Sequence, residues 1–181
     1  MTRYIAAPWR ADYVRRDASA ERCVFCEALK ARDDRARAVL LRGRRNFVLL
    51  NRYPYTPGHL MIAPARHEAD FAGARPDERA ELADLLQAAL RALRKAYAPQ
   101  GFNVGMNLGS CSGAGIAGHY HLHVVPRWTG DSNFMPIVGA TRVFIEDLDT
   151  TYHKLRPLFD QERRRRERAE RAKRRTAAPQ R

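Results

Sequence analysis

Polar and apolar residues alternate with a period of two from His119 to Val125, where three histidines are interleaved with Tyr120, Leu122 and Val124. This period is that of a half-buried β-strand, on which successive side chains point to opposite faces of the sheet. We therefore expect the three imidazoles to share one face while the tyrosine, leucine and valine point the other way. A strand that presents three histidines together indicates a functional site.

Apolar segments elsewhere predict four more strands, at residues 38–42, 45–51, 59–63 and 102–108. Gly43 separates the first two segments, and the pair is therefore expected to form a hairpin. Pro54 and Pro57 fix the backbone of a turn before the third segment.

A long amphipathic helix is predicted from Pro76, because proline suits the first helical position and Asp77 and Glu78 face the positive end of the helix dipole. Its apolar face consists of residues at three- and four-residue intervals: Leu82, Leu85, Leu86, Ala89, Leu93 and Tyr97. A final helix is predicted from Glu146 into the C-terminal tail. The order of strands, helix, strands and helix predicts an α+β domain with a mostly antiparallel sheet.

The chain has 181 residues, enough for one domain with a substantial core. We expect an N-terminal arm at 1–21, a domain at 22–160 and a basic tail at 161–181. No apolar run approaches the length that spans a bilayer, and the first residues lack the pattern of a secretory signal. Three cysteines, an odd number, argue against a disulfide framework. The expected location is the cytoplasm.

Positive charge is concentrated at the C-terminus. The net charge is +13, and residues 161–181 contain nine Arg and one Lys against three Glu, a net +7. The remaining +6 on the body favours polyanionic small molecules as ligands. The tail is interpreted first as a solvated helix extension, and alternatively as an arm that contacts nucleic acid through phosphates.

A loop rich in glycine and serine precedes the histidine segment. Residues 113–118 match the dinucleotide-binding fingerprint, but that fingerprint must open a helix and here a strand is expected to follow. The loop instead offers backbone N–H groups and the hydroxyls of Ser110 and Ser112, which suit phosphate oxygens. A flexible turn between two strands is the alternative.

The three histidines themselves allow a structural role, phosphate chemistry or a metal site. Alternate histidines on a strand can bind zinc or copper. No carboxylate lies near them in the sequence, although a distant one could complete such a site.

Residues 119–125 resemble the motif of the histidine triad family of nucleotide hydrolases and transferases, in which three histidines alternate with apolar residues. The upstream segment Asn51 to Leu60, with Pro54, Pro57 and His59, is similar to the segment of that family that carries a fourth histidine. The resemblance covers roughly residues 7 to 145. It implies an α+β sheet that pairs across a homodimer.

The same resemblance implies roles for individual residues. His121 would be the nucleophile that attacks the α-phosphorus of a nucleotide, with a nearby backbone carbonyl holding one ring nitrogen as the N–H donor. His123 would contact the phosphates and the leaving group, and His59 would support the site from the neighbouring strand. Asn51 would bind ribose and Asn107 would contact phosphates.

One position departs from the family pattern. Where its dinucleoside triphosphate hydrolases carry Gln-Thr, this chain has Gly115 and Ile116. Contacts to the leaving group would then come from Ser110, Ser112 or the backbone, Gly115 included.

Residues 7–10 and 126–134 resemble the bacterial diadenosine tetraphosphate phosphorylase branch, in which inorganic phosphate resolves the intermediate and gives ADP and ATP. Arg127 is expected either to help bind phosphate or to brace the strand end. Trp128 is expected either to shape the substrate pocket or to pack in the core.

Cys23 and Cys26 form a Cys-x-x-Cys pair, which alone is as consistent with two buried thiols as with a metal site. Some members of the family bind a structural zinc with this pair and two histidines. His67 and His119 occupy the corresponding positions, and together the four would form a tetrahedral Cys2His2 set.

The sequence therefore predicts an enzyme that cleaves dinucleoside polyphosphates through His121, with phosphorolysis favoured. A hydrolase of dinucleoside polyphosphates or nucleoside phosphoramidates is the first alternative. A nucleotide-sensing or nucleic-acid-binding protein without turnover is the second. We expect a homodimer or higher homo-oligomer, a structural zinc, no organic cofactor and no membrane contact.

Overall fold

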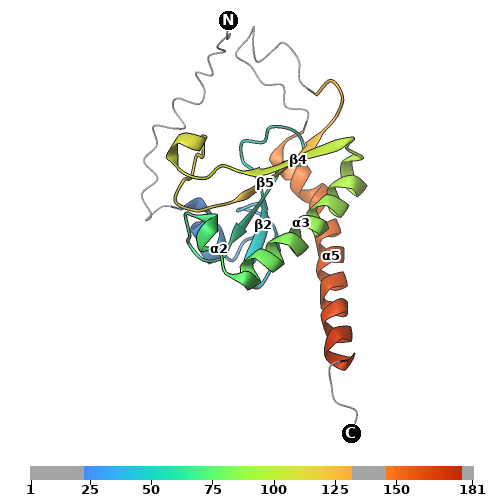
Figure 1. Cartoon of the computed structure of the whole chain (residues 1–181). Helices are drawn as coiled ribbons and strands as arrows, with labels where there is room; N and C mark the ends of the chain where they lie inside the picture. Colours follow the sequence, from blue (N-terminus) through green and yellow to red (C-terminus); the bar gives the residue numbers. More distant parts are fainter. Residues whose placement is uncertain (1–22, 132–145, 177–181) are drawn as a thin grey trace, which may run out of the picture.

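A computed structural model describes residues 23–131 and 146–176 of the chain (Figure 1). The expected N-terminal arm, with Trp9, lies outside the described residues, as do residues 132–145. The described residues form a five-stranded antiparallel sheet with strand order β1-β2-β3-β5-β4. The predicted α+β class is confirmed, and so is the antiparallel sheet.

The strands lie close to the predicted segments: β1 Val39–Arg42, β2 Asn46–Leu50, β3 Leu60–Pro64, β4 Gly101–Met106 and β5 Leu122–Arg127. The expected hairpin is confirmed, since β1 pairs antiparallel with β2, with an irregular register between Val39 and Leu41. β5 lies between β3 and β4 and pairs antiparallel with both.

The helices are α2 Val24–Lys30, α3 Pro76–Tyr97 and α5 Leu148–Thr176. The predicted long helix is confirmed with Pro76 in its first turn, and its leucine face is buried at Leu82, Leu85 and Leu93. α5 begins two residues later than expected and runs without interruption across residue 160. Within the described ranges, no helix combines the length and apolar character needed to cross a membrane.

The prediction of a strand from His119 to Val125 was wrong for its first three residues, because β5 begins at Leu122. The sheet ladder stops there because other bonds take over. The backbone N–H of Tyr120 donates to the carbonyl of Glu68 (2.7 Å), and the His119 ring contacts the carbonyl of Pro64. The segment is nevertheless held beside the end of β3.

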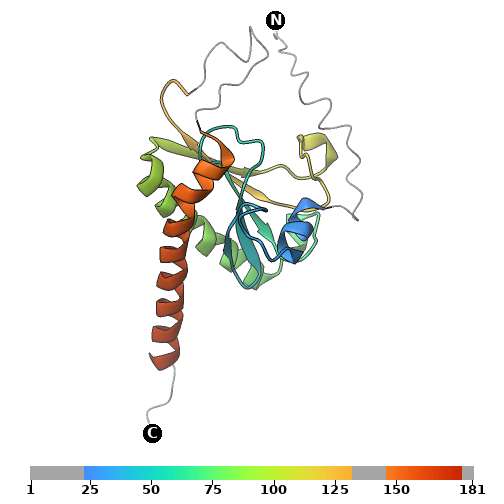
Figure 2. The ribbon, with the colours of Figure 1, turned by 180° about the vertical axis from the view of Figure 1, so that it is seen from behind.

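Two apolar clusters cover the two faces of the sheet. The larger lies beneath α3 and α5, which pack against each other and against the strands (Figures 1 and 2). The smaller lies beneath α2 and includes Phe25, Phe47 and Met61. Tyr120, Leu122 and Val124 all belong to the larger cluster. The expected alternation therefore holds even where the backbone is not a strand.

Glu81 of α3 fixes the turn between β1 and β2. Its carboxylate accepts the backbone N–H groups of Arg44 (2.9 Å), Arg45 (2.6 Å) and Asn46 (2.8 Å). The guanidinium of Arg166 on α5 adds a fourth bond at 3.0 Å. The turn is tightly packed here, since a Cβ at Gly43 would lie 2.7 Å from a carboxylate oxygen of Glu81. One side chain thus joins a hairpin, α3 and α5.

Burial by itself would raise the pKa of Glu81, but these donors outweigh it and lower the pKa below its usual value. A carboxylate whose pKa is lowered in the folded state stabilises the fold above its unfolded pKa. That contribution is lost as the pH falls through the folded pKa.

We expect Glu81→Gln to lower the free energy of unfolding by about 2 to 3 kcal/mol at neutral pH, because an amide replaces an anion that accepts several hydrogen bonds. Urea denaturation measures this. The difference from the wild type should shrink as the pH falls below the unfolded-state pKa of glutamate, about 4.3, and through the lower pKa of the folded state. Glu167→Gln, at an exposed position of α5, is the matched control and should change stability by less than about 0.5 kcal/mol. Equal effects of both substitutions would contradict this account.

Candidate functional site

The His119 ring is directed at the cysteines. Of the two other histidines of the 119–125 segment, His121 is the more buried. His121 is 4% exposed, and its Nδ1 lies 2.9 Å from the backbone carbonyl oxygen of His119. A carbonyl can only accept, so Nδ1 carries the proton and Nε2 has a free lone pair. Burial lowers the pKa of His121, which favours the neutral ring. The ring of Phe25 packs against it with centroids 4.8 Å apart.

His59 and His123 form a directed hydrogen-bond chain. The backbone N–H of Tyr55 donates to Nδ1 of His59 (3.1 Å), so a neutral His59 carries its proton on Nε2. That nitrogen lies 3.0 Å from Nδ1 of His123 and donates to it. The remaining proton of a neutral His123 is then on Nε2. Burial, helped by His121, lowers the pKa of His123 to about 4, which keeps the ring neutral.

Asn51 supports this chain. Its Oδ1 accepts the backbone N–H of Tyr53 (2.9 Å), which orients the amide so that Nδ2 lies 3.4 Å from Nδ1 of His59. The structure thus brings Asn51 and His59 together, with the amide directed at His59. The ribose-binding role of Asn51 stays a prediction.

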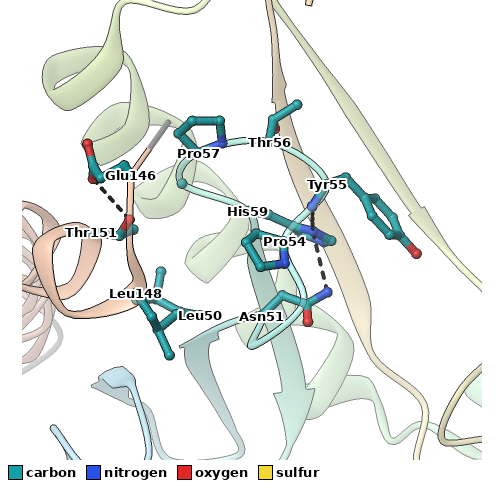
Figure 3. Close-up of a pocket in the computed structure, with 11 residues that line it drawn as sticks. Leu50, Asn51, Pro54, Tyr55, Thr56, Pro57, His59, Glu146, Leu148 and Thr151 are labelled. Atoms are coloured by element: carbon teal, nitrogen blue, oxygen red, sulfur yellow. Dashed lines mark hydrogen bonds between the residues drawn. The ribbon is translucent and has the colours of Figure 1, made fainter. Parts of the chain in front are cut away.

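A cavity opens next to these residues (Figure 3). It is lined by the turn from Leu50 to His59 and by residues at the start of α5: Glu146, Leu148 and Thr151. The carboxylate of Glu146 is engaged by Tyr97 Oη (2.6 Å) and by Thr151 Oγ1 (2.9 Å). Neither His121 nor His123 is among the lining residues. The cavity therefore adjoins the histidine cluster of His59, His121 and His123 through His59, which lines it, whereas the other two rings do not.

The residues expected to bind phosphate lie on the connection between β4 and the histidine segment. Asn107 directly follows β4. Ser110 and Ser112 are the first and last residues of the short 3-10 helix η3 Ser110–Ser112. The hydroxyl of Ser112 donates to the carbonyl of Gly109 (2.8 Å), so it braces its own loop. Among the described residues, no hydrogen bond joins Asn107, Ser110 or Gly115 to a histidine. Their phosphate contacts stay predictions.

Arg127 ends β5, and its guanidinium donates to Asp131 (2.8 Å) and to the side chain of Asn103. This arrangement favours the bracing interpretation over the phosphate-binding one. Trp128 is half-buried after the strand, and its backbone N–H donates to Asp131 at 3.1 Å. It belongs to neither apolar cluster described above, so its expected core role receives no support.

Cys23, Cys26, His67 and His119 form a cluster able to hold a metal ion, with all four donor atoms within 4.8 Å of one another. Nδ1 of His119 lies 3.3 Å from Sγ of Cys23, and Nδ1 of His67 lies 3.3 Å from Sγ of Cys26. Sequence reasoning placed these four together, and the structure brings them together.

The donor atoms suit a cation. The Nε2 atom of His119 lies 2.9 Å from the carbonyl of Pro64, so the proton is on that nitrogen and Nδ1 is free to bind a metal. Burial lowers the pKa of His119 to about 4 and, with the neighbouring Cys23, raises the pKa of the Cys26 thiol. Two thiol sulfurs and two imidazole nitrogens are a donor set that a metal ion binds once the thiols have lost their protons.

Sequence reasoning missed the ring contacts of two aromatic residues. Phe25 packs between the rings of His119 (5.0 Å) and His121 (4.8 Å), and Tyr55 packs on His59 at 4.6 Å. Phe25 lies between the two cysteines, so its place follows once those cysteines meet His119. Tyr55 is not apparent from the sequence, because its position depends on the path of the turn.

Residues 33–130 match the family model of the HIT domain. The chain therefore belongs to the HIT family. Over 113 residues it is 44% identical to the AP-4-A phosphorylase of Mycobacterium tuberculosis, covering 62% of this chain and 58% of that protein. The chain thus spans little more than half the length of this relative.

Two further comparisons agree with the family. The chain is 28% identical over 113 residues to an uncharacterised HIT-like protein of Saccharolobus solfataricus, covering 62% of this chain and 79% of that protein. It is also similar to the crystal structure of a Zn-bound histidine triad family protein from Mycobacterium smegmatis. That match has a TM-score of 0.62 and 26% identity over 79% of this chain and 96% of the other.

The hydrogen bonds predict the tautomer of each ring. In the imidazole nitrogen NMR spectrum at neutral pH, His121 should be protonated on Nδ1, whereas His59 and His123 should be protonated on Nε2. Asn51→Ala removes one of the two donors to His59 and should leave the His121 signal unchanged, which makes it the matched control. A His59 ring protonated on Nδ1 would rule out the chain from Tyr55 to His123.

Proposed function

We propose that this protein cleaves dinucleoside polyphosphates by nucleotidyl transfer to His121, and that inorganic phosphate then resolves the intermediate. Diadenosine tetraphosphate is the proposed substrate, with ADP and ATP as products. The observation that carries the proposal is the His121 ring, which is buried, neutral and held on Nδ1 by a backbone carbonyl. The 44% identity to an AP-4-A phosphorylase supports the choice of substrate.

In this mechanism Nε2 of His121 attacks the α-phosphorus, forming a phosphorus–nitrogen bond as the bond to the leaving polyphosphate oxygen breaks. The fixed Nδ1–H leaves Nε2 as the nucleophile and shares the positive charge that develops on the ring with the carbonyl of His119. Phosphate oxygen then attacks the same phosphorus and displaces the histidine, which regenerates the neutral ring.

His123 and His59 act on the leaving group in this proposal. The bonds from Tyr55 through His59 orient His123 so that its Nε2–H is available to a leaving oxygen. Phosphoryl-type transfer depends mainly on positioning and on stabilising charge, so a donor in a fixed orientation is effective. Burial lowers the pKa of His121 and of His123, which keeps both rings uncharged before substrate binds.

The remaining substrate contacts are proposed from the family resemblance. Asn107, Ser110, Ser112 and Gly115 lie on the loop that leads from β4 to the histidines, where backbone N–H groups suit phosphate oxygens. Asn51 is proposed for the ribose, whereas Arg127 is committed to Asp131 and is proposed as a brace.

We further propose zinc as the ion of the Cys23, Cys26, His67 and His119 cluster. Two thiolates and two imidazoles in tetrahedral reach are a typical structural zinc set, and a Zn-bound relative is similar in fold. The ion would hold α2 against the end of β3 and the histidine segment. It would thereby fix the backbone carbonyl of His119 that positions His121.

The homodimer and the cytoplasmic location stay predictions. β4 forms one edge of the sheet, and Val104 on that strand is 43% exposed. An edge strand with an exposed apolar side chain is a surface on which a second copy can pair.

We expect His121→Ala to lower turnover of diadenosine tetraphosphate by roughly 10³-fold or more, because the nucleophile is lost. His153→Ala is the matched control, since His153 is exposed on α5, and it should retain wild-type turnover. Thermal unfolding checks that both variants fold.

The products distinguish the proposed function from its alternatives. ADP plus ATP, formed only when phosphate is present, supports phosphorolysis. AMP plus ATP without phosphate would replace it by hydrolysis. Binding of the dinucleotide without any product would instead show a nucleotide-sensing protein.

Purified protein should contain one zinc per chain, measured by elemental analysis. The double variant Cys23→Ser/Cys26→Ser should lose the metal and unfold at a lower temperature, because two ligands are removed. Cys111→Ser is the control, since Cys111 is exposed and outside the cluster. A folded wild-type protein without zinc would disprove this assignment.

A further inference from the structure

The distal half of α5 has two chemically different faces. Its inner face carries three charged residues at four-residue intervals, Glu162, Arg166 and Glu170, each of which pairs with the body of the protein. Glu162 pairs with Arg91 (2.6 Å), Arg166 with Glu81 (3.0 Å) and Glu170 with Arg44 (2.6 Å). These pairs fix the rotation of the helix about its own axis.

The outer face is a stripe of arginines. Arg164, Arg168 and Arg171 are spaced by four and three residues, which places them on one side of the helix, opposite the paired residues. All three are exposed, and none forms an ion pair with a residue in the described ranges. Glu167 is the acidic residue between them. Three further basic residues follow in the sequence of the same helix: Lys173, Arg174 and Arg175.

The stripe lies on the solvent-exposed side of α5, opposite the ion-paired side. The lower part of α5 projects beyond the strands in both views of the ribbon (Figures 1 and 2). An α-helix rises about 1.5 Å per residue, so Arg164 and Arg171 lie roughly 10 Å apart along the axis. That span covers successive phosphates along a nucleic-acid strand.

We propose that the Arg164, Arg168 and Arg171 stripe binds the phosphodiester backbone of a nucleic-acid duplex. The site is separate from the histidine cluster, and it does not depend on the proposed function. Arginine is suited to this partner because its planar guanidinium forms paired hydrogen bonds with phosphate oxygens.

The composition of this part of α5 argues for a duplex over other polyanions. A membrane-surface helix needs an apolar face, and from residue 160 to 176 the apolar residues are Ala169 and Ala172. Proteins that bind single strands stack bases on aromatic side chains, and this stretch contains none. Contacts restricted to phosphates carry no base information, so the binding would not depend on sequence.

The test measures fluorescence anisotropy of a short labelled duplex, as DNA and as RNA of the same sequence, with the full-length protein. Arg164→Gln/Arg168→Gln is compared with Lys30→Gln/Arg32→Gln, which removes the same charge from two exposed positions near α2. Binding is measured between roughly 0.05 and 0.2 M salt. Circular dichroism melting confirms that both variants fold.

The stripe variant should weaken duplex binding by roughly tenfold to a hundredfold and reduce the slope of log affinity against log salt by about two. The control variant should keep both values. The DNA and RNA arms identify which duplex is preferred.

Three results would overturn the proposal. The first is an equal loss with both variants, which would mean that net charge alone sets the affinity. The second is no binding of either duplex by the wild type. The third is tighter binding to a single strand or to vesicles of anionic phospholipid than to a duplex.

Discussion

The alternation of side chains from His119 to Val124 is the constraint on which the rest of the structure depends. Tyr120, Leu122 and Val124 enter the core beneath α3 and α5, which turns the intervening histidines to the opposite side. A slip of one residue would exchange the two sets and place imidazoles in the apolar core. The cost of that exchange holds the histidines in position. The packing on one face of the sheet therefore fixes the position of the histidines on the other.

His119 links the cluster of Cys23, Cys26 and His67 to the neighbouring His121. Its ring contributes Nδ1 to the cluster and faces the Pro64 carbonyl with Nε2, while its own carbonyl accepts the bond from His121. Any movement of the His119 backbone would therefore move the acceptor that fixes the His121 tautomer. Phe25, packed on both rings, comes from the helix that follows Cys23. The cluster holds α2 next to His119. It therefore also helps to position the ring of His121, which is not one of its members.

The periodic parts of the fold were predictable because one residue type repeats where one face is buried, as in the leucines of α3. The four cysteine and histidine donors were predictable from the family resemblance. The start of β5 and the anchoring of the turn between β1 and β2 could not be predicted from the sequence, because both depend on hydrogen bonds from backbone groups to distant segments. The Glu68 carbonyl accepts the N–H of Tyr120, two residues before β5 begins, and Glu81 accepts three N–H groups of a turn more than thirty residues away. No periodicity records such partners.

The stability of α5 does not explain the arginines on its outer face. The helix is anchored by Tyr152, Leu155 and Phe159, which are buried in the larger cluster, and tertiary packing supplies most of the stability of such a helix. The ion pairs of the inner face add little where they are exposed, typically less than about 1 kcal/mol each. Like charges on the outer face repel one another and oppose the folded helix. Residues that cost stability while facing solvent are better explained by a partner that neutralises them.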